Sequence, residues 1–337
     1  MNTPTSSLEN SHFPVMLEEI TKICSPSKGG LYVDCTFGGG GYSSRLLKFS
    51  KTKVIAFDRD QFILKIAKNL KKKYPDRFFF YQKKFSELES VLSKPSVDAV
   101  VFDLGLSSIQ LKNLARGFSF KSEDKLDMSM GLSDFSAEEV VNNFSEQKLK
   151  LIIKVLGEEK DASRIAKNII KARSIKKIKK VDQLVEIIKK SKKQDYKKRI
   201  NPSTKTFQAL RIFVNKEVTE LIKGIVNATK FLKPGGKILV VSFHSIEDKI
   251  VKYFFNNFSS NSAKPSRYIP EDNNESFSLF DEYKNKIFKP STEEINKNLS
   301  SRSAKLRYAI RNKNKFIYPN KLIEKFKKYL DLESFYA

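Results

Sequence analysis

The chain has 337 residues, of which 40% are hydrophobic and 30% are charged. This composition is typical of a folded globular protein and excludes a disordered chain. Its two cysteines, Cys24 and Cys35, exclude a disulfide framework and a cysteine-rich zinc site, so no metal site is expected. No apolar run is long enough to span a bilayer, and the polar N-terminal dozen residues lack a signal-peptide pattern, so we expect a cytoplasmic protein with no membrane partner.

The formal net charge of +26 is unevenly distributed along the chain. Residues 164–205 contain 16 basic and 3 acidic side chains, a net charge of +13. A surface of this charge favours a nucleic-acid partner, because neutralised phosphates release their counterions. The alternative is a solvated lysine-rich surface, since 52 of the 64 basic residues are lysines.

The first hundred or so residues alternate between strand and helix patterns. Apolar runs rich in Val, Ile and Phe predict buried parallel strands at 31–35, 53–58, 78–82 and 97–103. Between the second and third strands, residues 61–73 place their apolar side chains on one helical face. This alternation predicts an α/β fold with a doubly wound, Rossmann-like sheet.

From about residue 120 to residue 205 the patterns are helical. Ser136 and Glu139 form a capping box, and amphipathic segments follow at 146–156, 162–173 and 181–190. We therefore predict a helical lobe inserted into the α/β domain.

The sheet is expected to resume after this lobe. A single long helix is predicted from about 204 to 232, ended by the Pro-Gly-Gly sequence that precedes a strand at 236–243. Three further segments follow: a mobile loop at 259–300, a closing strand at 304–310 and a final helix at 320–331.

Four glycines, residues 38–41, lie between the first strand and the next helix. Glycines at this place let a ligand lie against bare backbone at a helix N-terminus. Asp58 ends the second strand, 20 residues after Gly38, where a carboxylate can bind both hydroxyls of a ribose. The combination predicts a ligand of the nucleoside type.

S-adenosylmethionine is the nucleoside cofactor that this pattern favours. The dinucleotide fingerprint fails, because Ser43 stands where its last glycine is required, and the phosphate-binding loop of nucleotide hydrolases is absent. S-adenosylmethionine has no phosphate to seat, and a final antiparallel strand is typical of methyltransferase sheets. A nicotinamide-dependent oxidoreductase on a similar sheet is the rival interpretation.

Beyond these patterns, the chain resembles the bacterial family of 16S ribosomal RNA cytosine-N4 methyltransferases, the ribosomal RNA small subunit methyltransferases H. The resemblance extends from about residue 12 to residue 311. It is carried by the segments HFPVMLEE (12–19), DCTFGGGGYS (34–43), AFDRD (56–60), DLGLSS-x-Q (103–110), RGFSF (116–120), LDMSM (126–130), NPSTKTFQALRIFVN (201–215), LKPGGKILVVSFHSIEDKIVK (232–252) and RSAKLR (302–307).

The resemblance implies a class I methyltransferase sheet. Together with the helical lobe predicted above, we expect a division of the chain into four parts. Residues 1–115 and 206–312 would be the two parts of the methyltransferase domain. Residues 116–205 would be the inserted helical lobe, and residues 313–337 a C-terminal extension. The implied partner is 16S ribosomal RNA in the small ribosomal subunit, and the oligomeric state stays open between monomer and homodimer.

The resemblance also implies which residues bind the cofactor. They are Gly40, Gly41 and Tyr42 on the methionine side, Asp58 at the ribose, Phe85 beside the adenine, and Asp103 and Gln110 near the sulfonium and the catalytic mouth. The family usually has histidine where this chain has Tyr42. Because tyrosine cannot act as a base near neutral pH, we expect no proton-accepting role at this position.

Asp103 is the expected catalytic residue. A hydrogen-bond acceptor on the exocyclic N4 of cytosine would favour attack by this nitrogen and receive its proton. Alternatively, Asp103 only binds the cofactor. Neither cysteine is placed to attack C5 of a pyrimidine, and Leu-Gly-Leu-Ser-Ser replaces the Pro-Pro-Tyr type of loop found in DNA amino-methyltransferases.

Several other residues are candidates for contacts with RNA. Lys205 and Arg211 are expected to bind phosphates. Phe118 and Phe120 could stack on an extruded base, with a structural role equally open. His244 could face the substrate or be a buried structural histidine. A non-catalytic ribosome-assembly factor with a vestigial cofactor site is the alternative function, which the replacement at Tyr42 favours.

Overall fold

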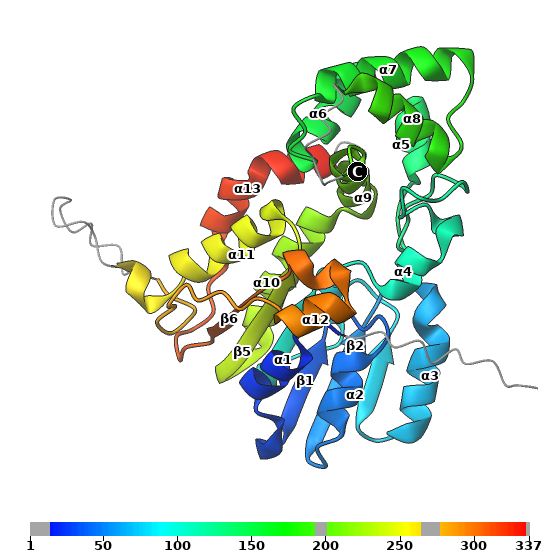
Figure 1. The fold of residues 1–337 in the computed structure, drawn as a ribbon. Coiled ribbons are helices and arrows are strands. Elements are labelled where there is room, and N and C mark those ends of the chain that lie inside the picture. Colours follow the sequence, from blue (N-terminus) through cyan, green and yellow to red (C-terminus); the bar gives the residue numbers. More distant parts are fainter. Residues whose placement is uncertain (1–13, 193–200, 264–276, 335–337) are drawn as a thin grey trace, which may run out of the picture.

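The computed structural model describes residues 14–192, 201–263 and 277–334 (Figure 1). Within these residues, six strands form one sheet in the order β3-β2-β1-β4-β5-β6. They are β1 (Gly30–Asp34), β2 (Thr52–Phe57), β3 (Phe78–Tyr81), β4 (Val97–Asp103), β5 (Leu232–Ser242) and β6 (Lys305–Ile310). All pairings are parallel except that of β6 with β5. The doubly wound α/β fold and its antiparallel closing strand are thereby confirmed.

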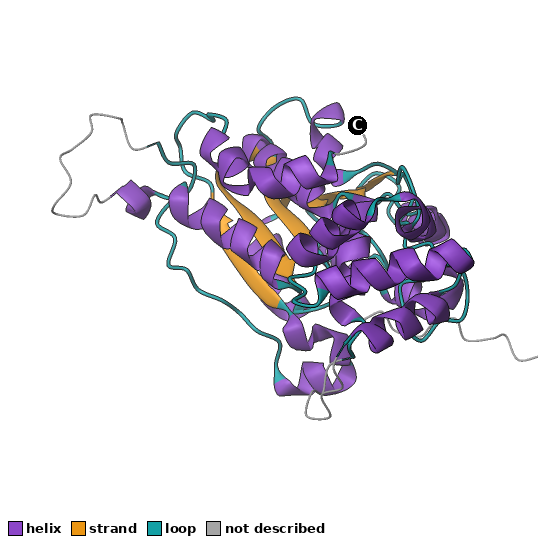
Figure 2. Ribbon diagram, turned by 90° about the horizontal axis from the view of Figure 1, so that it is seen from above, coloured by secondary structure: helices purple, strands orange, loops and turns teal. Residues whose placement is uncertain are grey.

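Helices cover both faces of the sheet (Figure 2). On one face lie α1 (Leu17–Cys24), α2 (Gly41–Leu47) and α3 (Leu64–Lys73), and on the other α10 (Glu217–Phe231), α11 (Ser245–Asn257) and α13 (Asn320–Glu333). Successive strand residues point to opposite faces of the sheet. In β4, Ala99 and Val101 pack on the face covered by α1, α2 and α3, and Val100 and Phe102 pack on the other face. This two-sided burial explains why the strands are almost continuously apolar.

The helical segments predicted between residues 136 and 191 are confirmed. They are α5 (Ala137–Asn143), α6 (Glu146–Leu156), α7 (Ala162–Ile175) and α8 (Val181–Ser191). Ser136 caps α5 with the predicted box to Glu139. These helices gather beyond the carboxyl edge of the sheet (Figure 1), and their apolar side chains belong to the same buried cluster as those of α9 (Thr204–Asn215) and α10. Residues 193–200, with four of the basic side chains of this stretch, lie outside the described residues.

The single helix predicted from 204 to 232 is wrong. Lys216 takes a left-handed conformation (φ 50°) and divides the segment into α9 and α10. The Pro-Gly-Gly sequence does not end a helix before a strand either: it lies within β5, where the register with β4 shifts between Val97 and Ala99. Gly235, with φ 81°, provides the irregular backbone of this bulge.

The segment predicted as a mobile loop, 259–300, contains isolated bridges and one α-helix in its described part. Phe280 and Phe288 form bridges to Arg311 and to β6, and α12 (Thr292–Lys297) follows. Residues 264–276 of the prediction lie outside the described residues.

The short helices that complete the fold are α4 (Ser108–Lys112) and the 3-10 turns η1 (Pro26–Lys28), η2 (Gln61–Ile63), η3 (Phe85–Ser90), η4 (Leu114–Arg116), η5 (Ser260–Ala263) and η6 (Leu299–Ser303). Over the described residues, no helix combines the length and the apolar character that crossing a membrane requires.

The C-terminal helix α13 is fixed to the N-terminus of α10 by a buried carboxylate. Glu333 Oε1 accepts a hydrogen bond from the Val218 amide (3.0 Å), and Oε2 accepts from the amide (2.8 Å) and hydroxyl (2.6 Å) of Thr219. Burial raises the pKa of Glu333 to about 8, although these hydrogen bonds oppose the shift. Glu333 therefore caps a helix other than its own.

We expect Glu333→Ala to lower the free energy of unfolding by about 1–3 kcal/mol, because it leaves the donors of α10 unsatisfied. Between pH 4.5 and about 8 the folded chain keeps a proton on Glu333 that the unfolded chain loses. The stability contributed by this group therefore falls as the pH rises through that window. We expect Glu333→Gln to remove this pH dependence, which is measured as the difference in the free energy of unfolding in urea between pH 6 and pH 8.5. The same difference in the wild-type protein and in the variant would contradict the raised pKa of Glu333.

Candidate active site

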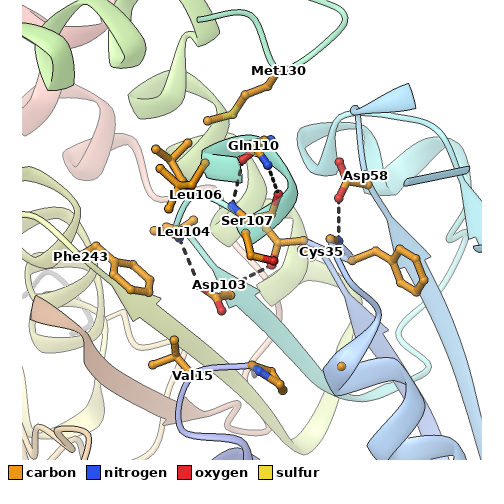
Figure 3. Close-up of a pocket in the computed structure, with 18 of the residues that line it drawn as sticks. Val15, Cys35, Asp58, Asp103, Leu104, Leu106, Ser107, Gln110, Met130 and Phe243 are labelled. Atoms are coloured by element: carbon orange, nitrogen blue, oxygen red, sulfur yellow. Dashed lines mark hydrogen bonds between the residues drawn. The ribbon is translucent and has the colours of Figure 1, made fainter. Parts of the chain in front are cut away.

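A cavity of about 520 Å³ opens at the carboxyl ends of the central strands (Figure 3). It is lined by the loops after β1, β2 and β4, by the first turn of α10, by Pro14 and Val15, and by Lys297, Asn298 and Ser300. The strand order reverses between β1 and β4, and α/β sheets bind their ligands at this kind of position.

The glycine loop forms one wall of this cavity. Asp34, at the end of β1, is buried and accepts hydrogen bonds from Ser43 Oγ (2.7 Å) and the Thr36 amide (3.3 Å). Gly41 lines the cavity, as does Gly38. Gly40 is not among the lining residues: it is the left-handed N-cap of α2, and a Cβ there would lie 2.8 Å from the Phe37 ring. Gly40 therefore shapes the turn.

Asp58 stands at the carboxyl end of β2 with its carboxylate fixed by backbone amides. Oδ2 accepts from the Gly38 amide (2.8 Å), and Oδ1 accepts from the Asp60 amide (2.9 Å). Burial raises the pKa of Asp58 to about 6. Each oxygen retains a lone pair, so the carboxylate can accept further hydrogen bonds from a ligand in the cavity.

Phe85 begins η3, just beyond β3, and lines the same cavity. Its ring meets the Phe102 ring edge to face, with the centroids 5.4 Å apart. A Cβ at Gly224 of α10 would lie 2.5 Å from this ring, so only glycine allows the helix to approach so closely. The ring is thus held as a flat apolar wall.

Asp103, the last residue of β4, is held on both oxygens. Oδ1 accepts from the Gly105 amide (3.1 Å), and Oδ2 lies 3.0 Å from the Tyr42 hydroxyl. Burial raises the pKa of Asp103 to about 6, while these hydrogen bonds lower it. The Tyr42 hydroxyl is also 2.6 Å from the carbonyl oxygen of Val15. Burial raises the pKa of Tyr42 well above its usual value, so Tyr42 is a donor and not a base.

Gln110 lines the cavity, but its amide group bonds to the protein (Figure 3). Its Oε1 accepts a hydrogen bond from the amide of Ser107 (3.0 Å), the residue that caps α4. Its Nε2 donates a hydrogen bond to Asp60 Oδ2 (3.1 Å). Asp60 also forms a buried ion pair with Arg116 (2.5 Å). Gln110 therefore fixes the loop after β4 to the end of β2.

The sequence interpretation missed a cluster at the break between α9 and α10. Arg59 donates to the carbonyl oxygens of Gly131 (2.6 Å), Asn215 (2.9 Å) and Leu132 (2.9 Å). Asn215 Oδ1 accepts from the Met130 amide (2.9 Å). Glu217 and Glu220, in the first turn of α10, line the cavity wall. Two acids so close together could have indicated a helix N-terminus at this place in the sequence.

Several expected RNA contacts need correction. Arg211 is held against Glu217 by two hydrogen bonds (2.9 and 2.8 Å) and is not available to phosphate. Phe118 is buried with Arg116 over its ring, and Phe120 packs edge to face on Phe207, which favours the structural interpretation of both. Lys205 is exposed and donates to the Glu158 carbonyl (2.8 Å).

His244 has a structural role as the N-cap of α11. Its Nδ1 accepts from the Glu247 amide (3.5 Å), and its Nε2 lies 2.9 Å from Glu247 Oε1. Together with Glu217, these side chains offer ligand atoms within 4.8 Å of one another. Arg211 already balances Glu217 at this place, so the cluster is an ion-pair network beside the cavity.

These features define a class of protein, the methyltransferases that bind a nucleoside cofactor. They are the doubly wound sheet with its closing antiparallel strand, the glycine loop after β1 and the carboxylate after β2. Residues 9–312 match the sequence profile of the MraW methylase family. The chain belongs to this family.

Curated relatives agree with this assignment. The chain is 41% identical over 306 residues to ribosomal RNA small subunit methyltransferase H of Rickettsia akari, covering 89% of this chain and 98% of the relative. It is 43% identical over 300 residues to the protein of the same name from Ehrlichia canis, covering 88% and 98%. The structure of an rRNA methylase from Streptococcus thermophilus matches with a TM-score of 0.40 and 10% identity over 90% of this chain and all of that one.

S-adenosylmethionine is the cofactor of the family, and the cavity fits it. Gly38 and Gly41 present bare backbone at the wall, Asp58 offers fixed carboxylate oxygens, and Phe85 offers a flat apolar surface. In addition, Glu220 Oε2 is a buried acceptor without a hydrogen-bond partner among the described residues. Membership of the methylase family excludes the rival interpretation as a nicotinamide-dependent oxidoreductase.

Both cysteines are unsuited to nucleophilic catalysis. Cys35 borders the cavity but is only 1% exposed, and Cys24 is the buried last residue of α1. Burial raises the pKa of the Cys24 thiol to about 12 and that of Cys35 well above its usual value.

We expect both thiols of the native protein to react slowly with Ellman's reagent at pH 8, because neither is ionised there. In guanidinium chloride both should react at once and give two equivalents. If one thiol of the native protein reacted rapidly, and peptide mapping located it, the result would contradict the conclusion that neither cysteine is a nucleophile.

Proposed function

We propose that the chain transfers a methyl group from S-adenosylmethionine to the exocyclic N4 of a cytidine in 16S ribosomal RNA of the small subunit. The observation that carries the proposal is Asp103, a fixed carboxylate at the end of β4 that faces a cavity large enough for a nucleoside. Family membership and the names of the relatives support the substrate class.

The cofactor-binding residues are assigned from their positions on the cavity wall. Gly41 and Tyr42 border the methionine end, where Gly40 sets the turn. Asp58 binds the ribose hydroxyls and Phe85 flanks the adenine. Asp103 borders the sulfonium end, and Gln110 holds the loop that closes it. When bound, S-adenosylmethionine supplies a methyl group already activated by its sulfonium, so the protein has mainly to align the reactants.

Asp103 supplies the acid–base chemistry. The N4 amine of cytosine is a poor nucleophile because its lone pair is delocalised into the ring. A carboxylate that accepts a hydrogen bond from this amine directs the lone pair toward the methyl group and takes the proton after transfer. Tyr42 and the Gly105 amide lie within hydrogen-bond distance of this carboxylate and position it.

The RNA is bound on the side of the helical lobe, which we assign to residues 116–205, between the two parts of the methyltransferase domain at 1–115 and 206–312. The turn between α7 and α8 carries a lysine-lined hollow formed by Lys176, Lys177, Lys179 and Lys180. Such side chains bind phosphates without reading the base sequence. Because the proposed substrate is ribosomal, we propose that the protein acts in the cytoplasm.

A non-catalytic assembly factor is not favoured. Its one support was tyrosine in place of histidine at position 42. Tyr42 here donates a hydrogen bond toward Asp103, so the site needs no base at this position. The acid at β4 and the cavity are both intact.

The proposal is tested by incubating labelled S-adenosylmethionine with small ribosomal subunits that lack this modification, followed by nuclease digestion and mass spectrometry. Label on N4 of a cytidine is the expected result. Label on another base would overturn the substrate assignment, and no label despite cofactor binding would favour the assembly factor.

The rate of methyl transfer should fall as the pH drops through about 6, because protonated Asp103 can no longer accept the N4 proton. Asp103→Asn should lower the single-turnover rate by about 10²–10⁴ and abolish this acid limb. Tyr42→Phe removes a hydrogen bond that stabilises the carboxylate, so it should move the limb to higher pH. An unchanged pH profile in both variants would assign Asp103 to cofactor binding alone.

A further inference from the structure

Glu220 presents an unused acceptor to the adenine end of the cavity. It lies in the first turn of α10, lines the cavity, and is 8% exposed. Its Oε1 accepts a hydrogen bond from Ser86 Oγ (3.1 Å). Its Oε2 is buried and has no hydrogen-bond partner within the part of the chain that the structure describes. A buried carboxylate oxygen without a donor is unfavourable, which indicates that a ligand supplies one.

The neighbouring cation does not supply this donor. Arg59 is the nearby positive charge, and Glu220 is the first of the acids that stabilise it electrostatically. However, the guanidinium donates its hydrogen bonds to the carbonyl oxygens of Gly131, Leu132 and Asn215 and to Ser133 Oγ. Arg59 therefore balances the charge of Glu220 and leaves Oε2 as an acceptor.

The position of Glu220 identifies which part of the cofactor reaches it. Ser86, its partner, directly follows Phe85, and α10 packs on Phe85 again through Gly224, one turn after Glu220. Asp58 and Arg59 are adjacent at the end of β2, on the ribose side. The methionine end lies at Tyr42 and Asp103. The donor that a cofactor carries beside Phe85 is the exocyclic amine of its adenine.

We propose that Glu220 Oε2 accepts a hydrogen bond from the adenine amine and makes the cavity selective for adenosine over inosine cofactors. The inference rests on the proposed placement of the ribose at Asp58 and of the base at Phe85. Hypoxanthine has a carbonyl oxygen in place of the amine, and a carboxylate facing that oxygen is repulsive. A site built to bind a donor rejects an analogue that lacks it, because its buried acceptor stays unpaired.

The test compares S-adenosylhomocysteine with S-inosylhomocysteine by isothermal titration calorimetry on the full chain. The wild-type protein should bind the adenosyl ligand at least about tenfold more tightly. Glu220→Leu should weaken the adenosyl ligand by about tenfold to a hundredfold and the inosyl ligand far less, so that the preference disappears. Glu220→Gln, which keeps the size and the contact with Ser86, should bind the inosyl ligand more tightly than the wild type does, because an amide can donate to its carbonyl.

Glu217→Gln is the matched control. Glu217 lines the same cavity, but both of its oxygens are bonded to Arg211, so its substitution should leave the ratio of the two affinities unchanged. Equal weakening of both ligands by Glu220→Leu and by Glu220→Gln would overturn the inference and leave Glu220 as a charge partner of Arg59. If the wild-type protein bound neither ligand, the cofactor assignment itself would fail.

Discussion

The parallel pairing of β1 with β4 determines where every functional group lies. The chain leaves β1 toward β2 on one side and leaves β4 toward α4 on the other, so the two loops diverge at the carboxyl edge and leave a cavity between them. Thr36 Oγ1 joins the two strands where they separate, by accepting a hydrogen bond from the Asp103 amide (2.8 Å). Neighbouring strand ends then supply a glycine loop, a carboxylate and an aromatic ring to one site.

The break at Lys216 adds the remaining wall. Because α10 starts afresh after α9, the acids of its first turn line the cavity, while α9 packs with the helices beyond the sheet edge. Arg59 and Asn215 connect the break to residues 130–132 through hydrogen bonds. These hydrogen bonds therefore join the end of α9 to residues beside the cavity wall.

Much of this arrangement could be predicted from the sequence. Buried parallel strands have a strong apolar signal, and a residue at the carboxyl end of such a strand, such as Asp58 or Asp103, has its place fixed by topology. The break at Lys216 escaped prediction because a lysine replaces the glycine that usually marks a left-handed residue. Likewise, the role of Gln110 depends on its hydrogen bond to Asp60, 50 residues away. The conformation of residues 277–303 depends on their bridges to β6 and Arg311. No local pattern records such contacts.

Tyr42 has one hydroxyl proton but two acceptors, the Val15 carbonyl oxygen and Asp103. When Asp103 is protonated, it can donate to the tyrosine oxygen while Tyr42 donates to Val15, and all three groups are satisfied. When Asp103 is ionised, the two acceptors compete for that single proton. Val15 lines the cavity, and the next residue, Met16, is bonded to Glu294 of α12. The charge on Asp103 therefore decides whether the single proton of Tyr42 is free to bond the Val15 carbonyl oxygen at the cavity wall.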